Sequence, residues 1–139
     1  MFSGEYSPPG GLRVIRANRN PPVLALSGEL DLATVQRPVD AVVAVLTQPA
    51  PEVLVLDLTG LAFLGAAGIR TLLATQDHAS ARGVGLRIVT GGNPVVERYL
   101  SVAGVRPVFD VYPDVPSALA VVDKGSFLDV AEGAWTENS

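Results

Sequence analysis

The hydrophobic positions of this chain form short apolar runs that alternate with segments of helical periodicity. The first two runs, Leu12–Ala17 and Val23–Ser27, are separated by the turn-forming stretch Asn18–Pro22 and predict a β-hairpin. A third run, Val53–Leu56, is apolar at every position, which is typical of a central strand buried on both faces. Two further runs predict a fourth strand and a short edge strand, at Leu86–Val89 and Val108–Phe109.

Segments of helical periodicity follow the second and third of these strands. The first helix is expected to start near Thr34–Arg37 and to end at Thr47, because Pro38 is tolerated only in a first turn. A loop is expected at Leu58–Gly68. The second helix then runs to Arg82-Gly83, where the glycine can end it.

Two later helices complete the pattern. The third is expected to begin at Asn93-Pro94, which combines a capping side chain with a proline suited to the first turn. Its apolar face is expected to hold Val95, Val96, Tyr99, Leu100 and Val102. The fourth is expected to follow a capping Asp114 and to carry Ala118, Leu119 and Val122. Strands and helices that alternate in this way predict an α/β fold with a mixed, mostly parallel sheet of about five strands and four to five helices.

The chain length of 139 residues predicts a single domain with flanking segments. Residues 1–10 are rich in Gly, Pro and Ser, and we interpret them as a flexible N-terminal arm. The domain is expected to span residues 11–122. Residues 123–139 have few periodic positions and are interpreted as a C-terminal tail. Its single tryptophan, Trp135, is an anchor either for a partner or for the chain's own surface, and the sequence leaves both open.

Composition and charge narrow the classes of function. Hydrophobic residues make up 48% of the chain and charged residues 17%, which excludes a disordered chain. The net charge of −4 excludes a general affinity for nucleic acid or for anionic membranes. The longest uncharged run, Leu58–Ile69, is too short to span a bilayer, and the first residues lack the basic and apolar regions of a signal peptide. We therefore expect a soluble cytoplasmic domain with no membrane insertion.

Residues that could support catalysis are few. The chain has no Cys and one His, so thiolate chemistry is excluded, and we expect neither a metal nor a cofactor. Asp57 follows the central strand, but a phospho-accepting Asp needs neighbouring carboxylates and a lysine, and the single lysine is Lys124 in the tail. We expect Asp57 to accept backbone hydrogen bonds instead. A nucleophilic triad would need a serine held beside a histidine base. His78 is expected on the outer face of its helix, and nothing in the sequence places it beside a serine.

Two other patterns are only weak indications of a ligand site. The stretch Gly65-Ala66-Ala67-Gly68 is similar to a phosphate-binding turn before a helix, but no Lys-Ser or Lys-Thr pair follows it. Arg13, Arg16 and Arg19 form a small basic end, which indicates a solvated face because no aromatic residues are interleaved. The residues alone therefore predict a small binding module and not an enzyme.

Two segments of this chain resemble the STAS domains of the anti-sigma factor antagonist family. Leu24–Asp31, followed by Thr34, resembles that family's second strand and the loop that leaves it. Val53–Ile69 resembles its central strand, loop and helix start. The later pattern of Asn93-Pro94-Val95-Val96, Leu100 and Gly104 also fits. The resemblance covers about residues 11–122 and implies the fold of those domains.

The resemblance implies a function in protein binding. In the best-known branch, the antagonist binds an anti-sigma factor that is also a serine kinase, and thereby frees a sigma factor. Phosphorylation of a serine at the start of the helix after the third strand releases the complex, because phosphoserine adds about −1.5 to −2 charges. The usual motif there is Asp-Ser-Ser-Gly or Asp-Ser-Thr-Gly. This chain has Gly65, Ala66, Ala67 and Gly68 at those positions, so the usual phosphorylation switch is not expected.

The resemblance also implies which residues contact the partner. These are Asp31, Thr34, Gly65, Ala66, Ala67 and Arg70, whereas Ile69, Leu72 and Leu73 are expected to point inward. Three interpretations stay open: a constitutive antagonist, an antagonist controlled by a ligand or by the tail, or a STAS protein with another role. That other role would be a cytoplasmic accessory subunit of a lipid or anion transporter, or a stress-signalling scaffold. The oligomeric state is also left open.

Overall fold

The computed structural model describes residues 11–47 and 49–120, which form one mixed five-stranded sheet with helices packed on it. The strands are β1 (Leu12–Arg19), β2 (Pro22–Leu30), β3 (Val53–Leu64), β4 (Gly85–Val89) and β5 (Asp110–Tyr112). Their order across the sheet is β1-β2-β3-β4-β5; β1 and β2 are antiparallel, and the other neighbours are parallel. The predicted fold class, the hairpin and the central position of β3 are therefore confirmed. The expected N-terminal arm, Val122 and the tail with Trp135 lie outside the described residues.

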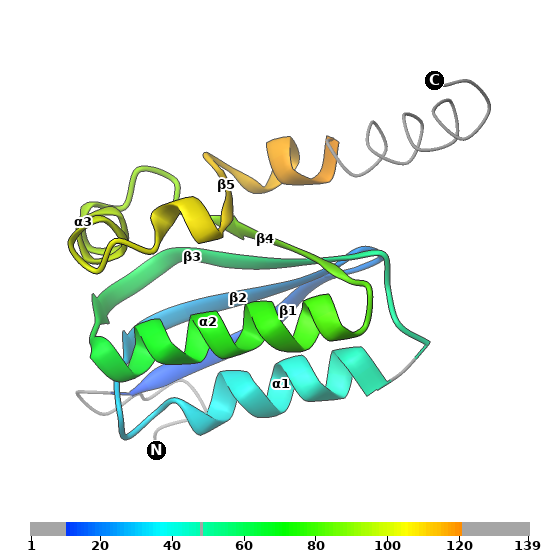
Figure 1. Cartoon of the computed structure of the whole chain (residues 1–139), viewed down its shortest axis with the longest axis horizontal. Coiled ribbons are helices and arrows are strands. Elements are labelled where there is room, and N and C mark those ends of the chain that lie inside the picture. The colour runs from blue at the N-terminus through cyan, green and yellow to red at the C-terminus, as the bar shows by residue number, and fades with distance from the viewer. Residues whose placement is uncertain (1–10, 48, 121–139) are drawn as a thin grey trace, which may run out of the picture.

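Three helices connect the parallel strands: α1 (Gln36–Thr47), α2 (Ala66–Ala81) and α3 (Pro94–Val102). Each connection moves one strand further in the same direction across the sheet. Because such crossovers are almost always right-handed, all three helices are expected on the same face. Figure 1 shows α1 and α2 side by side on one face of the sheet, and Val96 and Leu100 of α3 join the same core cluster.

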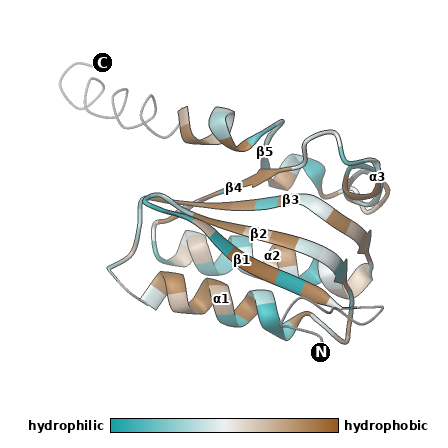
Figure 2. Cartoon of the chain, turned by 180° about the vertical axis from the view of Figure 1, so that it is seen from behind, coloured by the Kyte–Doolittle hydropathy of each residue, from teal (hydrophilic) through white to brown (hydrophobic). Residues whose placement is uncertain are grey.

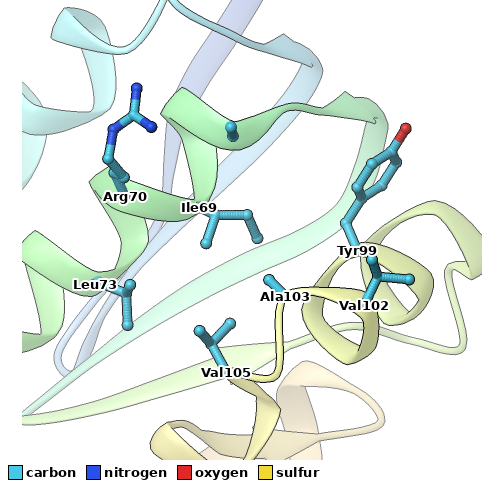
Figure 3. Close-up of a pocket in the computed structure, with 8 residues that line it drawn as sticks. Ile69, Arg70, Leu73, Tyr99, Val102, Ala103 and Val105 are labelled. Carbon is cyan, nitrogen blue, oxygen red and sulfur yellow. The ribbon is translucent and has the colours of Figure 1, made fainter.

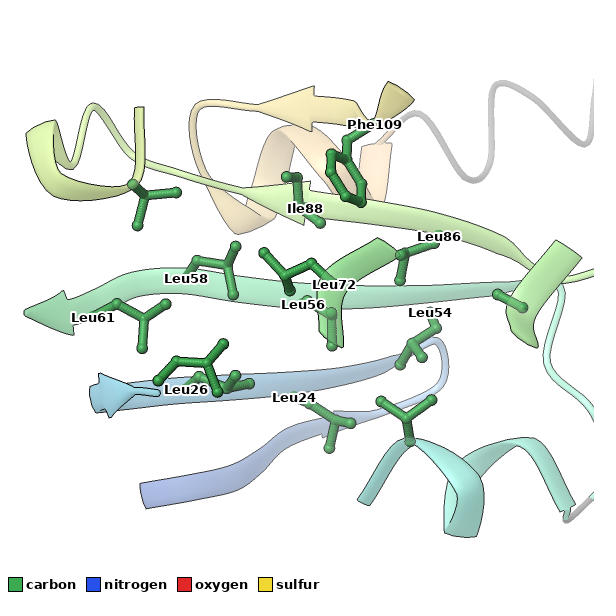
Figure 4. Close-up of a cluster of buried hydrophobic side chains, with 14 of the residues drawn as sticks. Leu24, Leu26, Leu54, Leu56, Leu58, Leu61, Leu72, Leu86, Ile88 and Phe109 are labelled. Atoms are coloured by element: carbon green, nitrogen blue, oxygen red, sulfur yellow. The ribbon is translucent and has the colours of Figure 1, made fainter. Parts of the chain in front are cut away.

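The main core lies between these helices and the sheet. The side chains of Leu54, Leu56 and Leu58 alternate along β3 toward the helices and are 0–2% exposed. They pack with Ile88 of β4 and Leu72 of α2 in one cluster (Figure 4). Burying a side chain of this size stabilises the fold by about 1.5–3 kcal/mol, so this layer fixes the positions of the helices.

A smaller cluster covers part of the opposite face of the sheet. Residues 115–120 are helical, and Ala118 is fully buried against a patch of valines on that face. The valines come from the three central strands and are Val23, Val53, Val55 and Val89. The helix begins as predicted, since the Asp114 carboxylate accepts a hydrogen bond from the Ser117 N–H at 2.7 Å. The face is open over β1, where Ile15 is 45% exposed (Figure 2).

The central strand β3 is longer than its neighbour β4. Its first part, Val53–Asp57, pairs with β4, but its last residues pair only with the end of β2, up to Leu30 opposite Leu64. The predicted loop at Leu58–Gly68 is therefore wrong for Leu58–Leu64, which continue the strand. Leu58, Leu61 and Leu64 are buried, and their spacing of three, which looks irregular for a strand, reflects the shift in register between β2 and β3.

Asn93 satisfies the backbone of β3 where β4 no longer reaches it. Its side-chain oxygen caps α3 by accepting a hydrogen bond from the Val95 N–H at 3.0 Å. Its amide nitrogen donates to the carbonyl oxygens of Thr59 at 3.0 Å and Leu61 at 2.8 Å. One side chain therefore both starts α3 and attaches it to the extended part of β3.

The segment after α3 differs from the prediction. Val108 lies in a short 3-10 helix, Arg106–Val108, and the edge strand begins two residues later than predicted, at Asp110. Pro107 explains the difference, because proline lacks the N–H that a strand would use and suits a first helical turn. Phe109 is 7% exposed and belongs to the main core, so its apolar character reflects burial and not a place in the sheet.

Because Asn93 both caps α3 and binds β3, we expect that an aspartate at this position lowers the stability of the fold. Asn93→Asp keeps the capping oxygen but removes the amide donor, so two β3 carbonyls lose their partner and face a carboxylate. An unsatisfied polar group costs about 1–3 kcal/mol when buried, and of the two carbonyl groups that of Thr59 is exposed and can bind water, so we expect a loss of about 1–2 kcal/mol in the free energy of unfolding. Urea denaturation measures this loss. A loss below about 0.5 kcal/mol would indicate that capping alone matters.

Candidate functional site

The turn that follows β2 is held by its own side chains. The Thr34 hydroxyl donates to the Glu29 carbonyl oxygen at 2.7 Å and accepts from the Asp31 N–H at 3.0 Å. The Asp31 carboxylate accepts from the Ala33 N–H at 3.0 Å. Thr34 is buried, whereas Leu32 at the tip of the turn is 78% exposed. Thr34 therefore shapes the turn, and the side chains that a partner can reach are those of Asp31 and Leu32.

The start of α2 lies against this turn. The Gly65 N–H donates to the carbonyl oxygen of Leu30 at 3.1 Å. A side-chain methyl group at Gly68 would come within 2.8 Å of that same carbonyl oxygen and 2.7 Å of the Leu64 side chain, so only glycine allows this approach. The structure thus brings together the two segments for which the resemblance implies partner contact, the Asp31 turn and Gly65–Arg70.

The first turn of α2 carries no charge of its own. Gly65 occupies the N-cap position in an extended conformation and supplies no capping side chain, and the first turn has no acidic residue. Ala66 is exposed and Ala67 half-buried, so both lie where a partner can approach. The free N–H groups of a helix start have a partial positive charge, which here is not balanced by a nearby capping carboxylate.

A groove of about 430 Å³ runs between α2 and α3, next to this surface. It is lined by Ala66, Ile69, Arg70, Leu73, Tyr99, Val102, Ala103 and Val105, and we refer to these residues as the groove. Figure 3 shows the residues of α2 on one side, and those of α3 and the following turn on the other. Arg70 is the one charged residue of the lining, so the groove suits an apolar ligand surface with a negative charge near it.

Exposed apolar side chains extend the groove. Phe63, at the end of β3, is 38% exposed, and its ring meets that of Tyr99 edge-on with centroids 6.2 Å apart. Tyr99 is 37% exposed and Val102 is 77% exposed. Both were predicted on one apolar face of α3 together with Val95, Val96 and Leu100, but Val96 and Leu100 are the buried residues of that helix. A nine-residue helix with five such apolar positions has more of them than one face can bury, which is the signal that the sequence contained.

Comparison with known proteins agrees with this geometry. The family model described as "Mlab, STAS domain" matches residues 14–109, which is more than half of the chain. The chain belongs to the STAS domain family. The anti-sigma-F factor antagonist RsfB of Mycobacterium tuberculosis is 31% identical over 120 residues, covering 86% of this chain and 96% of RsfB.

One further relative and one solved structure are also described as antagonists of anti-sigma factors. A candidate anti-anti-sigma factor of Mycobacterium tuberculosis is 36% identical over 70 residues, and the match spans 50% of this chain and 47% of that protein. The crystal structure of an anti-sigma factor antagonist from Mycobacterium paratuberculosis superposes with a TM-score of 0.74 at 28% identity, covering 85% of this chain and 99% of that one. The STAS fold that the sequence implied is therefore confirmed.

The other polar positions considered in this STAS domain have structural explanations. The Asp57 carboxylate accepts hydrogen bonds from the Thr59 N–H at 3.0 Å and from the Thr59 hydroxyl at 2.8 Å, as expected for a backbone acceptor, although within the strand. His78 is exposed on the outer face of α2, as predicted. Among the described residues, no group of three or more His, Asp or Glu side chains is placed to hold a metal ion. No helix in the same part of the chain is both long and apolar enough to cross a membrane.

A polar brace supports the α3 side of the groove. The Glu97 carboxylate accepts hydrogen bonds from the Thr90 hydroxyl at 2.6 Å and from Arg106 Nε at 2.8 Å. Thr90 follows β4 and Arg106 begins the 3-10 helix, so Glu97 ties α3 to both. The hydrogen bond from Arg106, and then that from Thr90, lower the pKa of Glu97 below its usual 4.5.

This brace predicts that the wild type and Glu97→Gln differ in melting temperature, and that the difference depends on pH. Because the folded pKa of Glu97 lies below the unfolded one, its contribution to stability is fully present above about pH 4.5 and is lost as the pH falls through the folded pKa. We expect Glu97→Gln to melt at a lower temperature than the wild type at pH 7, and the difference to shrink below about pH 4.5. Melting curves at about pH 7 and about pH 3.5 measure it. A difference that is equal at both pH values would contradict the role of the charge.

Proposed function

We propose that this STAS domain is an anti-sigma factor antagonist, which binds an anti-sigma factor and thereby frees a sigma factor for transcription. The relatives with that name support the proposal, since the likeness to RsfB extends over 86% of this chain. The observation that carries it is the contact between the Asp31 turn and the start of α2, through the Gly65 N–H and the Leu30 carbonyl oxygen. Two segments that are far apart in the sequence thereby form one continuous surface beside an apolar groove.

The proposed docking surface consists of Asp31, Gly65, Ala66, Ala67 and Arg70, and the groove continues it. Thr34 acts on this surface through the shape of the turn, since its side chain is buried. Such a surface works by binding and not by catalysis. Its centre is small and apolar, and its charges, Asp31 and Arg70, lie at the sides. Interfaces commonly have this arrangement, with an apolar centre and a polar rim.

We also propose that the phosphorylation switch of the serine-kinase branch is absent. Ala66 and Ala67 have no hydroxyl to accept a phosphate. The nearest hydroxyl groups are engaged: that of Thr71 is buried and donates to the Ala67 carbonyl oxygen at 3.0 Å, and that of Thr59 donates to Asp57. Binding would then be controlled by some means other than charge at the start of α2.

A charge placed at the start of α2 tests the docking surface. Ala67→Asp puts a carboxylate near a helix N-terminus, which stabilises the free protein by about 0.3–1 kcal/mol. Burying that carboxylate unpaired in an interface costs several kcal/mol. Because each 1.4 kcal/mol corresponds to a factor of about ten, we expect the affinity for the anti-sigma factor to fall at least about tenfold. Calorimetry with the anti-sigma factor identified by pull-down of the full chain measures the change. Arg70→Ala should act in the same direction but less strongly, because rim charges contribute less.

Ala81→Asp is the matched control for Ala67→Asp. It makes the same substitution at the opposite end of α2, at an exposed position, and should leave the affinity unchanged. If Ala67→Asp binds as tightly as the wild type and keeps its melting temperature, then this surface is not the interface.

The proposed loss of the switch has a separate test. After incubation with the kinase-type anti-sigma factor and ATP, mass spectrometry should find no phosphate at the start of α2 in the wild type. The double variant Ala66→Ser, Ala67→Ser restores the hydroxyl groups and should be phosphorylated there. Stoichiometric phosphate on Thr59 or Thr71 of the wild type would contradict the proposal.

A further inference from the structure

The groove between α2 and α3 is open on its α3 side. Val102 on that wall is 77% exposed and Tyr99 is 37% exposed, whereas Ile69 on the α2 wall is buried. Sites for small molecules commonly bury about 70–90% of the ligand surface, which a wall this open does not allow. Contiguous exposed apolar surface is instead typical of a contact with another protein. The groove therefore suits a protruding side chain of a protein partner better than a free small molecule.

The groove is continuous with the docking surface, because Ala66 and Arg70 belong to both. At the start of α2, a side-chain methyl group at Gly65 would come within 2.9 Å of the Phe63 ring, so glycine at this position leaves room for the ring beside the helix start. Phe63 in turn meets the ring of Tyr99 edge-on. The two rings thereby connect the start of α2 to the α3 wall of the groove.

Arg70 gives the groove a positive charge that is not neutralised by an ion pair. It is exposed at the α2 edge of the groove (Figure 3). Within the described part of the chain, the ion pairs are Arg87 with Asp110 and Arg106 with Glu97, so Arg70 has none. Charges across a protein interface are commonly arranged so that opposite signs face each other. An occupant that places a carboxylate beside an apolar side chain therefore complements the groove.

The same charge disfavours a second copy of this chain as the occupant. In a symmetric dimer, the same patch of both subunits meets. The Arg70 of each copy would then approach a groove whose lining holds no carboxylate. A different protein fits the groove better, and the residues shared with the docking surface identify it as the partner that binds there.

We propose that the α2–α3 groove binds an apolar side chain of the anti-sigma factor, and that a carboxylate beside that side chain pairs with Arg70. This inference rests on the proposed function and names the chemistry by which the partner is selected. A few anchor side chains that fill pockets commonly carry most of the binding energy of an interface. Recognition of this kind needs no hydroxyl group at the start of α2, where the chain has Ala66 and Ala67.

A carboxylate on the groove wall tests the apolar anchor. Because Val102 is 77% exposed, Val102→Asp should cost the free protein little stability, which a melting curve checks. In the complex the carboxylate would be buried against an apolar side chain, so we expect calorimetry of the full chain with the anti-sigma factor to show at least about a tenfold loss of affinity. Ile15→Asp is the matched control on the opposite face of the sheet, where Ile15 is 45% exposed, and should leave the affinity unchanged.

Arg70→Glu tests the carboxylate of the partner. The variant reverses the charge, so the affinity should fall at least about tenfold in about 0.05 M salt, and the loss should shrink in about 0.5 M salt, where charges are screened. Arg70→Gln removes the charge without reversing it and should cause a smaller loss of about threefold. Changing the contacted acidic residue of the anti-sigma factor to arginine should restore the affinity of Arg70→Glu. Equal losses for Arg70→Glu and Arg70→Gln that do not depend on salt would overturn the pairing.

The outcomes separate this inference from the proposed function. In the complex, NMR should show contacts between the methyl groups of Val102 and Val105 and an apolar side chain of the anti-sigma factor. If Ala67→Asp weakens the complex but Val102→Asp does not, the groove is not a contact, and the inference is overturned while the proposed function stands. If the wild type binds no anti-sigma factor, both fail. Dimers in sedimentation that Val102→Asp dissociates would assign the groove to a second copy and would also overturn the inference.

Discussion

The extension of β3 past β4 is the constraint on which the functional end of this domain depends. A strand edge without a neighbour leaves backbone carbonyl groups unpaired, and burying such groups is costly. Here the Asn93 amide takes the carbonyl oxygens of Thr59 and Leu61, and the same side chain starts α3. The helix is therefore anchored beside the extension instead of beside β4. This placement creates the groove, since it sets α3 opposite the first turns of α2.

The sequence predicted the repetitive parts of this fold well. Val53–Leu56 was identified as a central strand because every position is apolar, and the structure buries both faces of it. Asn93-Pro94 and Asp114 were identified as helix starts from local chemistry, and both side chains make their capping bonds. These elements depend on contacts within a few residues or on the periodicity of one segment, which a single sequence contains.

The parts that could not be predicted depend on contacts between distant segments. The end of β3 looks like a loop because Thr59 and Gly60 interrupt its apolar run, and only its pairing with β2 makes it a strand. Tyr99 and Val102 are apolar, but they are exposed because α3 packs on the core through Val96 and Leu100. For the candidate site, the resemblance supplied Asp31 and Gly65–Arg70, while the groove and its aromatic rim arise from tertiary packing. The resemblance also implied that Thr34 contacts the partner, but its hydroxyl makes its hydrogen bonds inside the turn. A role assigned from a motif alone can therefore miss that a side chain is structural.

Gly68 has a consequence for how a partner would bind at the proposed docking surface. Its missing side chain lets α2 approach the Leu30 carbonyl oxygen so closely that the turn after β2 and the start of α2 pack directly against each other. A surface that is already rigid loses little conformational entropy when it is covered, so more of the contact energy remains as affinity. For the proposed docking surface we expect association without rearrangement of this side, at a rate set by diffusion, orientation and the few charges at the rim. At the proposed docking surface we therefore expect adjustment of shape to fall to the molecule that binds the domain.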